Sequence, residues 1–206
     1  GMNKIVKDTL SITVITLVAG LALGIVQDIT AGPIARQAEL TKQEAYKAVF
    51  RDATSFEEYL PDETKQAVDL VTYLDENGYG AQTIDEIMKA LDDSGEILGY
   101  AFTVTTSEGY GGDIQFAMGV QNDGTLNGIS ILSISETAGL GMKADTDEFK
   151  DQFKNKQVEK FQYTKSGASA DDEIDAISGA TITTNAMTNG VNAGICAFHY
   201  VEGGES

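Results

Sequence analysis

The sequence has very few of the side chains that usually carry out chemistry. Its 206 residues include a single cysteine, Cys196, and a single histidine, His199. One cysteine excludes an internal disulfide framework and a CxxC motif. With one histidine, the chain also lacks a zinc constellation and any Ser-His-Asp or Cys-His pair at readable spacing. We therefore expect any chemistry to come from a cofactor rather than from the chain's own side chains.

Basic residues are also scarce, with 14 lysines and arginines against 32 aspartates and glutamates and a formal net charge of −18. Nucleic acid and anionic lipid surfaces are therefore poor partners for the soluble part of the chain, because like charges repel. Apolar residues still make up 42% of the positions. That content is sufficient for one medium-sized domain with a hydrophobic core once a membrane segment is set aside.

Residues 9–27 form an uncharged run, and as a helix these nineteen residues would reach about 28 Å, enough to cross a bilayer. Lys4 and Lys7 precede the run and Asp28 follows it, so the positive-inside rule predicts a cytoplasmic N-terminus over residues 1–8. A cleaved signal peptide is the alternative, but the run is longer than a usual signal core and no convincing small-x-small cleavage site precedes Asp28. We predict a single-pass protein of the cytoplasmic (inner) membrane with an extracytoplasmic main domain.

The rest of the chain divides into a juxtamembrane linker, residues 28–40, and a folded domain, residues 41–206. Two helices are predicted early in the domain. Thr41 and Glu44 form a capping box ahead of apolar residues at helical spacing, which are Tyr46, Val49, Phe50 and Ala53. A second helix is predicted with Thr83 and Glu86 as its cap and an apolar stripe of Ile84, Ile87, Met88 and Leu91.

From Leu98 onward the apolar residues recur at every second position, which is the period of a β-strand. The alternation predicts strands over residues 98–104 and 114–120. Asn122-Asp123-Gly124 predicts a hairpin turn into a third strand over residues 126–134. Antiparallel strands with helices before and after them predict an α+β domain, an antiparallel sheet flanked by helices.

The most informative stretch runs from Asp175 through Ser178-Gly179-Ala180-Thr181 into a helical pattern that extends to about Tyr200. Gly179 permits a tight turn with positive φ, and the first backbone N–H groups of the following helix have no partner within it. Such a helix start attracts a phosphate or another anion. The alternative interpretation is that Ser178 or one of the threonines only caps the helix.

The four-residue word Ser178 to Thr181, with Asp175 three residues before it, resembles the flavinylation motif of the FMN-binding domain family. The resemblance implies that a flavin transferase joins FMN covalently through its phosphate to the hydroxyl of Thr181, the last residue of the word. It also implies that Asp175 serves recognition by the transferase. Thr183 and Thr184 are nearby hydroxyls, but neither occupies the final position of the motif.

A second glycine-rich stretch, Glu136-Thr137-Ala138-Gly139-Leu140-Gly141, leaves the third predicted strand. It resembles the Glu-Thr-Pro-Gly-Leu-Gly loop of two branches of that family, the G subunit of Rnf-type ion-translocating complexes and the C subunit of sodium-pumping NADH:quinone reductases. In those proteins the loop lies against the flavin. The resemblance therefore adds five residues to the cofactor site: Glu136, Thr137, Gly139, Leu140 and Gly141. Ala138 departs from the pattern, because it stands where the family usually has proline.

The order of the matching segments resembles the Rnf branch most. That resemblance implies a membrane-anchored electron-transfer protein, which works with the other subunits of a membrane redox complex in ferredoxin:NAD⁺ oxidoreduction coupled to Na⁺ or H⁺ transport. Two alternatives stay open. One is a related flavin carrier of a sodium-pumping NADH:quinone reductase, and the other is a non-redox, anchored extracytoplasmic binding domain.

Overall fold

The computed structural model describes residues 9, 12–17, 36–60 and 69–204. Residue 9 and residues 12–17 are helical, but most of the predicted membrane segment, residues 9–27, lies outside the described residues. Within the described ranges, no helix combines the length and apolar character that a membrane span needs. The chain separates into two units, Gly1–Thr41 and Lys42–Ser206. The second unit carries the strands and the helices from residue 55 onward, together with residues 42–49 of a helix that begins at residue 36.

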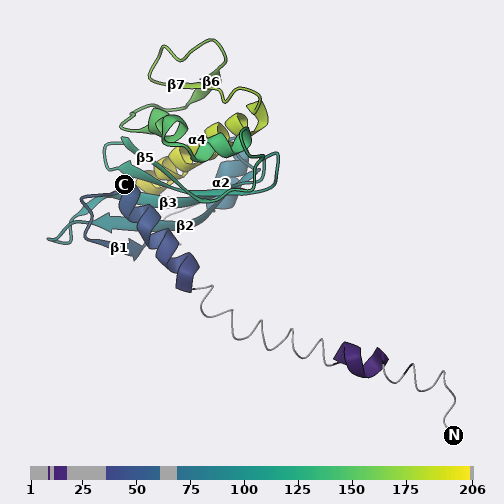
Figure 1. Cartoon of the computed structure of the whole chain (residues 1–206). Helices are drawn as coiled ribbons and strands as arrows, with labels where there is room; N and C mark the ends of the chain where they lie inside the picture. The colour runs from purple at the N-terminus through teal and green to yellow at the C-terminus, as the bar shows by residue number, and fades with distance from the viewer. Residues whose placement is uncertain (1–8, 10–11, 18–35, 61–68, 205–206) are drawn as a thin grey trace, which may run out of the picture. The chain divides into compact units, whose positions relative to one another are not determined.

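A five-stranded antiparallel sheet forms the centre of this second unit, with its strands in chain order (Figure 1). The predicted strands are confirmed as β3, β4 and β5, and the Asn122–Gly124 hairpin turn is confirmed by Gly124, whose φ is +84°. Two further strands, β1 and β2, extend the sheet beside β3. The strands are β1 Ser55–Glu58, β2 Gln82–Leu91, β3 Ile97–Thr106, β4 Ile114–Gln121 and β5 Leu126–Ser133.

The C-terminal helix α4, Thr181–Gly204, packs on one face of the sheet and makes the main core (Figure 1). The predicted stripe of Met187, Val191, Ile195 and Phe198 is confirmed, since all four side chains are buried. Two glycines let the helix approach closely. A Cβ atom at Gly190 would lie 2.9 Å from the Phe116 ring, and one at Gly194 would overlap the Met118 sulfur. This close packing fixes the start of α4 relative to the sheet.

A helix over residues 36–49 supplies the apolar face that covers the opposite side of the sheet. The side chains of Tyr46, Val49 and Phe50 are buried against small residues of the sheet, among them Ala101 and Ala117. The burial predicted for the stripe is confirmed for all four residues, Ala53 included, although the helix ends before Phe50 and Ala53. The predicted cap is wrong. Thr41 lies inside the helix, and its hydroxyl donates to the carbonyl of Gln37 at 3.0 Å. Threonine hydroxyls in helices often bond back to residue i−4, and the sequence pattern cannot distinguish this bond from capping.

The predicted helix with Thr83 and Glu86 as its cap is also wrong, because residues 82–91 form strand β2. The strand carries a β-bulge between Ile84 and Glu86, at which the pairing with β3 shifts by one residue. A bulge places residues three positions apart on the same face of a strand. Ile84 and Ile87 therefore both contact the core under α4, whereas Met88 contacts the opposite cluster. The bulge thus mimicked the i, i+3 spacing of a helix.

Short elements connect β5 to α4 and bring the chain to the start of that helix. They are η1 Gly141–Asp145, α3 Asp147–Lys150, η2 Asp151–Phe153, β6 Gln162–Thr164 and β7 Glu173–Asp175. Strands β6 and β7 pair in parallel as a separate two-stranded sheet. The buried Asn192 side chain of α4 bonds both backbone groups of Phe161, at 2.7 and 2.9 Å, just before β6. Helix α2, Leu70–Glu76, packs beside α4 through Tyr73 and Tyr200.

Candidate functional site

The Ser178–Thr181 word forms the turn between β7 and α4. Gly179 has a φ of +77°, a left-handed conformation that glycine adopts without strain. The backbone N–H of Ala180 donates to the carbonyl of Ile177 at 3.0 Å and closes the turn. Helix α4 then begins at Thr181. The predicted handover from a strand to a helix through a glycine turn is confirmed.

The three threonines at the start of α4 differ in what their hydroxyls bond. The Thr183 hydroxyl donates to the Glu136 carboxylate at 3.1 Å. The Thr184 hydroxyl donates to the carbonyl of Ala180 and accepts the N–H of Ile177, both at 3.0 Å. Within the described part of the chain, the Thr181 hydroxyl makes no hydrogen bond. Thr181 is half-buried, and its hydroxyl is therefore the one of the three that a modification can use without breaking a bond.

The first turn of α4 also has backbone N–H groups that have no acceptor among the described residues. Thr184 contributes the first backbone N–H that bonds back to a carbonyl at the helix start. Over the residues described, no bond satisfies the N–H groups of Thr181, Ile182 and Thr183. Free N–H groups and the positive end of the helix dipole favour an anion at this position. The structural requirement for a phosphate beside Thr181 is met.

The glycine-rich loop after β5 lies against this turn. The carbonyl of Thr137 accepts the N–H groups of Leu140 and Met142, at 3.1 and 3.2 Å, which folds the loop back on itself. Gly139 has a φ of +77° at the bend. A Cβ atom at Gly179 would stand 3.1 Å from Leu140 Cδ2, so the loop contacts the motif directly. The structure thus brings together the two stretches that the sequence singled out.

Glu136 differs from the rest of its loop in being buried. Residues 137–140 are exposed, but only 9% of Glu136 is accessible to solvent. Its Oε1 accepts the backbone N–H of Gly111 at 3.1 Å, and its Oε2 accepts the Thr183 hydroxyl. The Glu136 side chain therefore points inward and connects three segments of the chain.

The third of these segments, the turn over residues 109–112 between β3 and β4, was not predicted as part of the site. It carries Tyr110, whose side chain is 71% exposed. Leu140 of the loop and Ile182 of α4 are also large apolar residues left exposed. These three exposed side chains lie on the segments that the Glu136 hydrogen bonds connect. The sequence feature that could have identified this turn is Tyr110, an aromatic residue within a glycine-rich connection.

Comparison with known proteins identifies the family. The FMN-binding domain profile matches residues 109–195, which include all three converging segments. The G subunit of the Na⁺-translocating ferredoxin:NAD⁺ oxidoreductase complex of Acetobacterium woodii is 31% identical over 186 residues, covering 88% of this chain and 86% of that protein. The chain belongs to the G-subunit family. The G subunit of the ion-translocating oxidoreductase complex of Methanosarcina acetivorans is 28% identical over 94% of both chains.

The fold of this G-subunit family member is also found in a solved structure. The C subunit of the Na⁺-translocating NADH-quinone reductase of Parabacteroides distasonis aligns with a TM-score of 0.50, over 75% of this chain and 79% of that one, at 22% identity. At that level of identity the likeness concerns the fold alone.

Asp175 and Ser178, the remaining polar residues of the Asp175–Thr181 stretch in this family member, are both exposed. The Asp175 carboxylate accepts the backbone N–H of Ala168 at 2.6 Å, which holds the loop between β6 and β7. The Asp175 backbone N–H donates to the side chain of Gln152 at 2.6 Å. Asp175 thus orients the strand that leads into the motif and leaves its outer side accessible.

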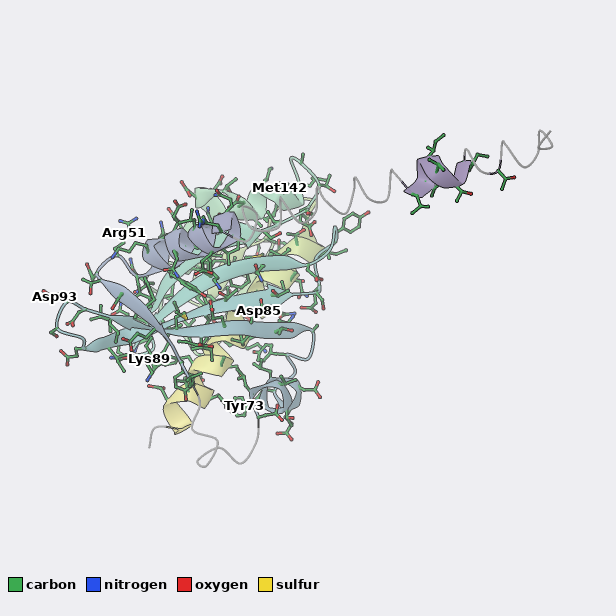
Figure 2. The ribbon with its side chains drawn as sticks, turned by 90° about the horizontal axis from the view of Figure 1, so that it is seen from below. Arg51, Tyr73, Asp85, Lys89, Asp93 and Met142 are labelled. Carbon is green, nitrogen blue, oxygen red and sulfur yellow. The ribbon has the colours of Figure 1, made fainter. Side chains whose placement is uncertain are left out.

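The domain of this family member also has a cavity of about 400 Å³, but it lies away from the motif. Its lining includes Arg51, Leu98, Gln121, Asn127 and Lys154, and no residue of the Glu136–Gly141 loop or of the Ser178–Thr181 turn. Figure 2 shows Arg51 well apart from Met142, which follows that loop. Among the residues described, no three His, Cys, Asp or Glu side chains form a cluster that could hold a metal ion.

Proposed function

We propose that this member of the G-subunit family carries FMN covalently, through a phosphate ester to Thr181, and relays electrons within a membrane-bound ion-translocating oxidoreductase complex. The observation that carries the proposal is that, among the described residues, neither the Thr181 hydroxyl nor the N–H groups of the first turn of α4 have a hydrogen-bond partner. Bound FMN would supply the redox chemistry, because the chain's own side chains provide none.

The residues around Thr181 suit a flavin phosphate. In ester formation the Thr181 oxygen would bond to the flavin phosphorus of a pyrophosphate-type flavin nucleotide, the P–O bond to the leaving nucleotide phosphate would break, and the hydroxyl proton would pass to solvent. No hydrogen bond among the described residues is lost. The N–H groups of Ile182 and Thr183 can donate to the phosphate oxygens, and the helix dipole favours their negative charge by about 0.3–1 kcal/mol. Gly179 lets the backbone approach the phosphate, and Ala180 and Ser178 complete the turn. A flavin transferase would reach Thr181 from the exposed side of the motif, where Asp175 is accessible.

The flavin ring would lie on the apolar surface that adjoins Thr181. Tyr110, Leu140 and Ile182 are 71%, 42% and 53% exposed, and they lie on the three segments that Glu136 connects. A flat aromatic ring that covers these side chains removes apolar area from water, at about 25 cal/mol per Å² buried. Thr137, Gly139 and Gly141 would contribute backbone contacts from the loop. A shallow surface is sufficient because the covalent bond, and not a deep pocket, retains the cofactor.

The position in the cell follows from the sequence prediction. An anchor over residues 9–27 would hold the domain at the outer surface of the cytoplasmic membrane, near other subunits of the complex. The relatives of Acetobacterium woodii and Methanosarcina acetivorans are both named as subunits of ion-translocating complexes. By analogy we assign this chain to ferredoxin:NAD⁺ oxidoreduction rather than to quinone reduction. It acts as an electron carrier and not as the site of substrate turnover.

Covalent flavin is tested by co-expression with a flavin transferase, denaturing electrophoresis and in-gel flavin fluorescence. We expect a fluorescent band for the wild type and for Ser55→Ala, which removes an exposed hydroxyl of β1 outside the proposed site. We expect complete loss of fluorescence for Thr181→Ala. Mass spectrometry of the tryptic peptide should assign the added mass to Thr181. A dark wild-type band, or a Thr181→Ala band as bright as the wild type, contradicts the proposal.

A further inference from the structure

The most unusual group outside the attachment point is the Glu136 carboxylate. It is 91% buried, yet none of the ion pairs among the described residues includes it. Burial of a carboxylate is unfavourable unless hydrogen bonds replace its water. Here each oxygen accepts one bond, from the N–H of Gly111 and from the Thr183 hydroxyl, both at 3.1 Å. Both carboxylate oxygens therefore have a donor in place of the lost water.

The chain is shaped around this carboxylate. A Cβ atom at Gly141 would lie 2.6 Å from Glu136 Oε2 and 2.6 Å from the Thr183 hydroxyl oxygen. A Cβ atom at Gly109 would lie 2.9 Å from Glu136 Oε1. Glycine at both positions therefore allows the backbone to close over the carboxylate from two sides. Tight packing therefore holds the Glu136 carboxylate in one place.

The charge also lies close to the proposed attachment point. Its hydrogen-bond partner Thr183 is two residues from Thr181 in the first turn of α4. The positive end of the helix dipole stabilises an anion there. The loop that Glu136 begins contacts Gly179 through Leu140. A flavin held at Thr181 and lying on Leu140 and Tyr110 would cover the segments that the carboxylate connects.

We infer that Glu136 is a positioning residue of the flavin site, which ties the Tyr110 turn and the Leu140 loop to α4 and places a fixed negative charge beneath the flavin. The inference rests on the proposed function. Each electron that the flavin takes up adds one negative charge to it unless a proton follows. A neighbouring carboxylate in a water-poor site opposes that added charge. Glu136 therefore lowers the reduction potential of the flavin.

The variant Glu136→Gln tests the effect of the charge alone, because it removes the charge and keeps both hydrogen bonds. The amide oxygen accepts the N–H of Gly111, and the amide NH₂ donates to the Thr183 hydroxyl, which turns to accept it. Both bonds are kept and the charge is removed. We expect flavin loading equal to the wild type, a melting temperature close to the wild type, and a reduction potential shifted to a more positive value. The potential is measured by dithionite titration of the loaded full-length protein against reference dyes.

The matched control is Glu148→Gln, which removes one negative charge from an exposed residue of α3. We expect its flavin potential to equal that of the wild type. A second variant, Glu136→Ala, removes both hydrogen bonds. For this variant we expect a lower melting temperature and lower fluorescence anisotropy of the attached flavin, since the Tyr110 turn and the Leu140 loop are no longer tied to α4.

The outcomes distinguish this inference from the proposed function. If the wild type acquires no covalent flavin, the proposed function fails and the inference fails with it. If wild type and Glu136→Gln are both loaded and have the same potential, the proposed function stands and the role of the charge is overturned. If Glu136→Ala keeps the melting temperature and the flavin anisotropy of the wild type, the positioning role is overturned.

Discussion

The two ends of the sheet differ in how they present polar and apolar groups. At the end where β3 passes into β4, the Tyr110 turn, the Leu140 loop and the start of α4 leave apolar side chains exposed and N–H groups unbonded. At the opposite end, the lining of the 400 Å³ cavity includes Gln121 and Asn127, whose side chains bond each other. There the Asn127 amide donates to the carbonyl of Val49 at 2.9 Å and accepts the Gln121 amide at 2.5 Å.

The 400 Å³ cavity and the proposed flavin site thus lie at different ends of the sheet. A cofactor that binds by contact alone needs a cavity to bury most of its surface. A cofactor held by a covalent bond needs a free hydroxyl, donors for its phosphate and a surface to cover. The end with Thr181 has these features, whereas at the end with the cavity the side-chain amides of Gln121 and Asn127 already have partners.

The largest effect is expected from Gly141→Ala, at the end with Thr181. The added methyl group would lie 2.6 Å from both Glu136 Oε2 and the Thr183 hydroxyl oxygen, and it would separate the two. Overpacking of this kind costs about 1–3 kcal/mol of unfolding free energy. We also expect weaker flavin loading, because the loop can no longer lie against α4. Chemical denaturation and in-gel fluorescence measure the two effects.

Gly139→Ala is the control for that variant within the same loop. A Cβ atom at Gly139 meets nothing within 4 Å, but the φ of +77° strains any other residue. The strain costs about 1–2 kcal/mol, and the contact with Glu136 is kept. If Gly139→Ala reduced flavin loading more than Gly141→Ala, the tight packing around Glu136 would not be what orders this end.

A smaller effect is expected from Asn127→Ala, at the cavity end. The carbonyl of Val49 loses the side-chain N–H that it accepts, which costs about 1–3 kcal/mol for a buried group and less for this half-buried one. Flavin loading should equal that of the wild type, because no residue of the flavin site touches Asn127. Gln157→Ala removes the hydrogen bond that the Gln157 side-chain amide donates to the exposed carbonyl of Asp123. It should change the free energy of unfolding by less than about 0.5 kcal/mol. Reduced loading in Asn127→Ala would mean that the two ends are coupled.

The smallest effect concerns the acid stability of the β2–β3 turn, also at the cavity end. Hydrogen bonds from the Ser94 hydroxyl and from the N–H of Glu96 lower the pKa of Asp92 below its ordinary value. A lowered folded-state pKa adds stability above the unfolded pKa of about 3.9, and this stability is lost as the pH falls through the folded value. Asp92→Asn should therefore lose slightly less stability than the wild type between pH 7 and pH 3.

Urea denaturation at the two pH values measures the difference. Asp93→Asn is the control, since the Asp93 carboxylate accepts no hydrogen bond within the described part of the chain. An acid dependence of Asp92→Asn equal to that of both the control and the wild type would contradict the role of the turn.

The sequence alone determined the elements whose apolar spacing is regular. Strands β3, β4 and β5 and helix α4 were predicted because periods of two and of 3.6 residues specify which side chains face the core. Strand β2 was mistaken for a helix because a bulge at Asp85 places Ile84 and Ile87 on one face. The start of the helix over residues 36–49 was missed because Thr41 resembles a cap but bonds backward. The spacing of residues along the chain could not reveal either error, because strand pairing and long-range packing decide both structures.

For the site, the chain by itself identified the Ser178–Thr181 word and the Glu136–Gly141 loop as separate stretches. Only the tertiary structure decided that they touch, and that the Tyr110 turn joins them. It also distinguished the Thr181 hydroxyl, which is unbonded, from those of Thr183 and Thr184, and it turned the Glu136 carboxylate inward. The physical reason is that a hydrogen bond between residues 47 positions apart, such as Glu136 to Thr183, depends on how α4 packs on the sheet and leaves no mark in the local sequence.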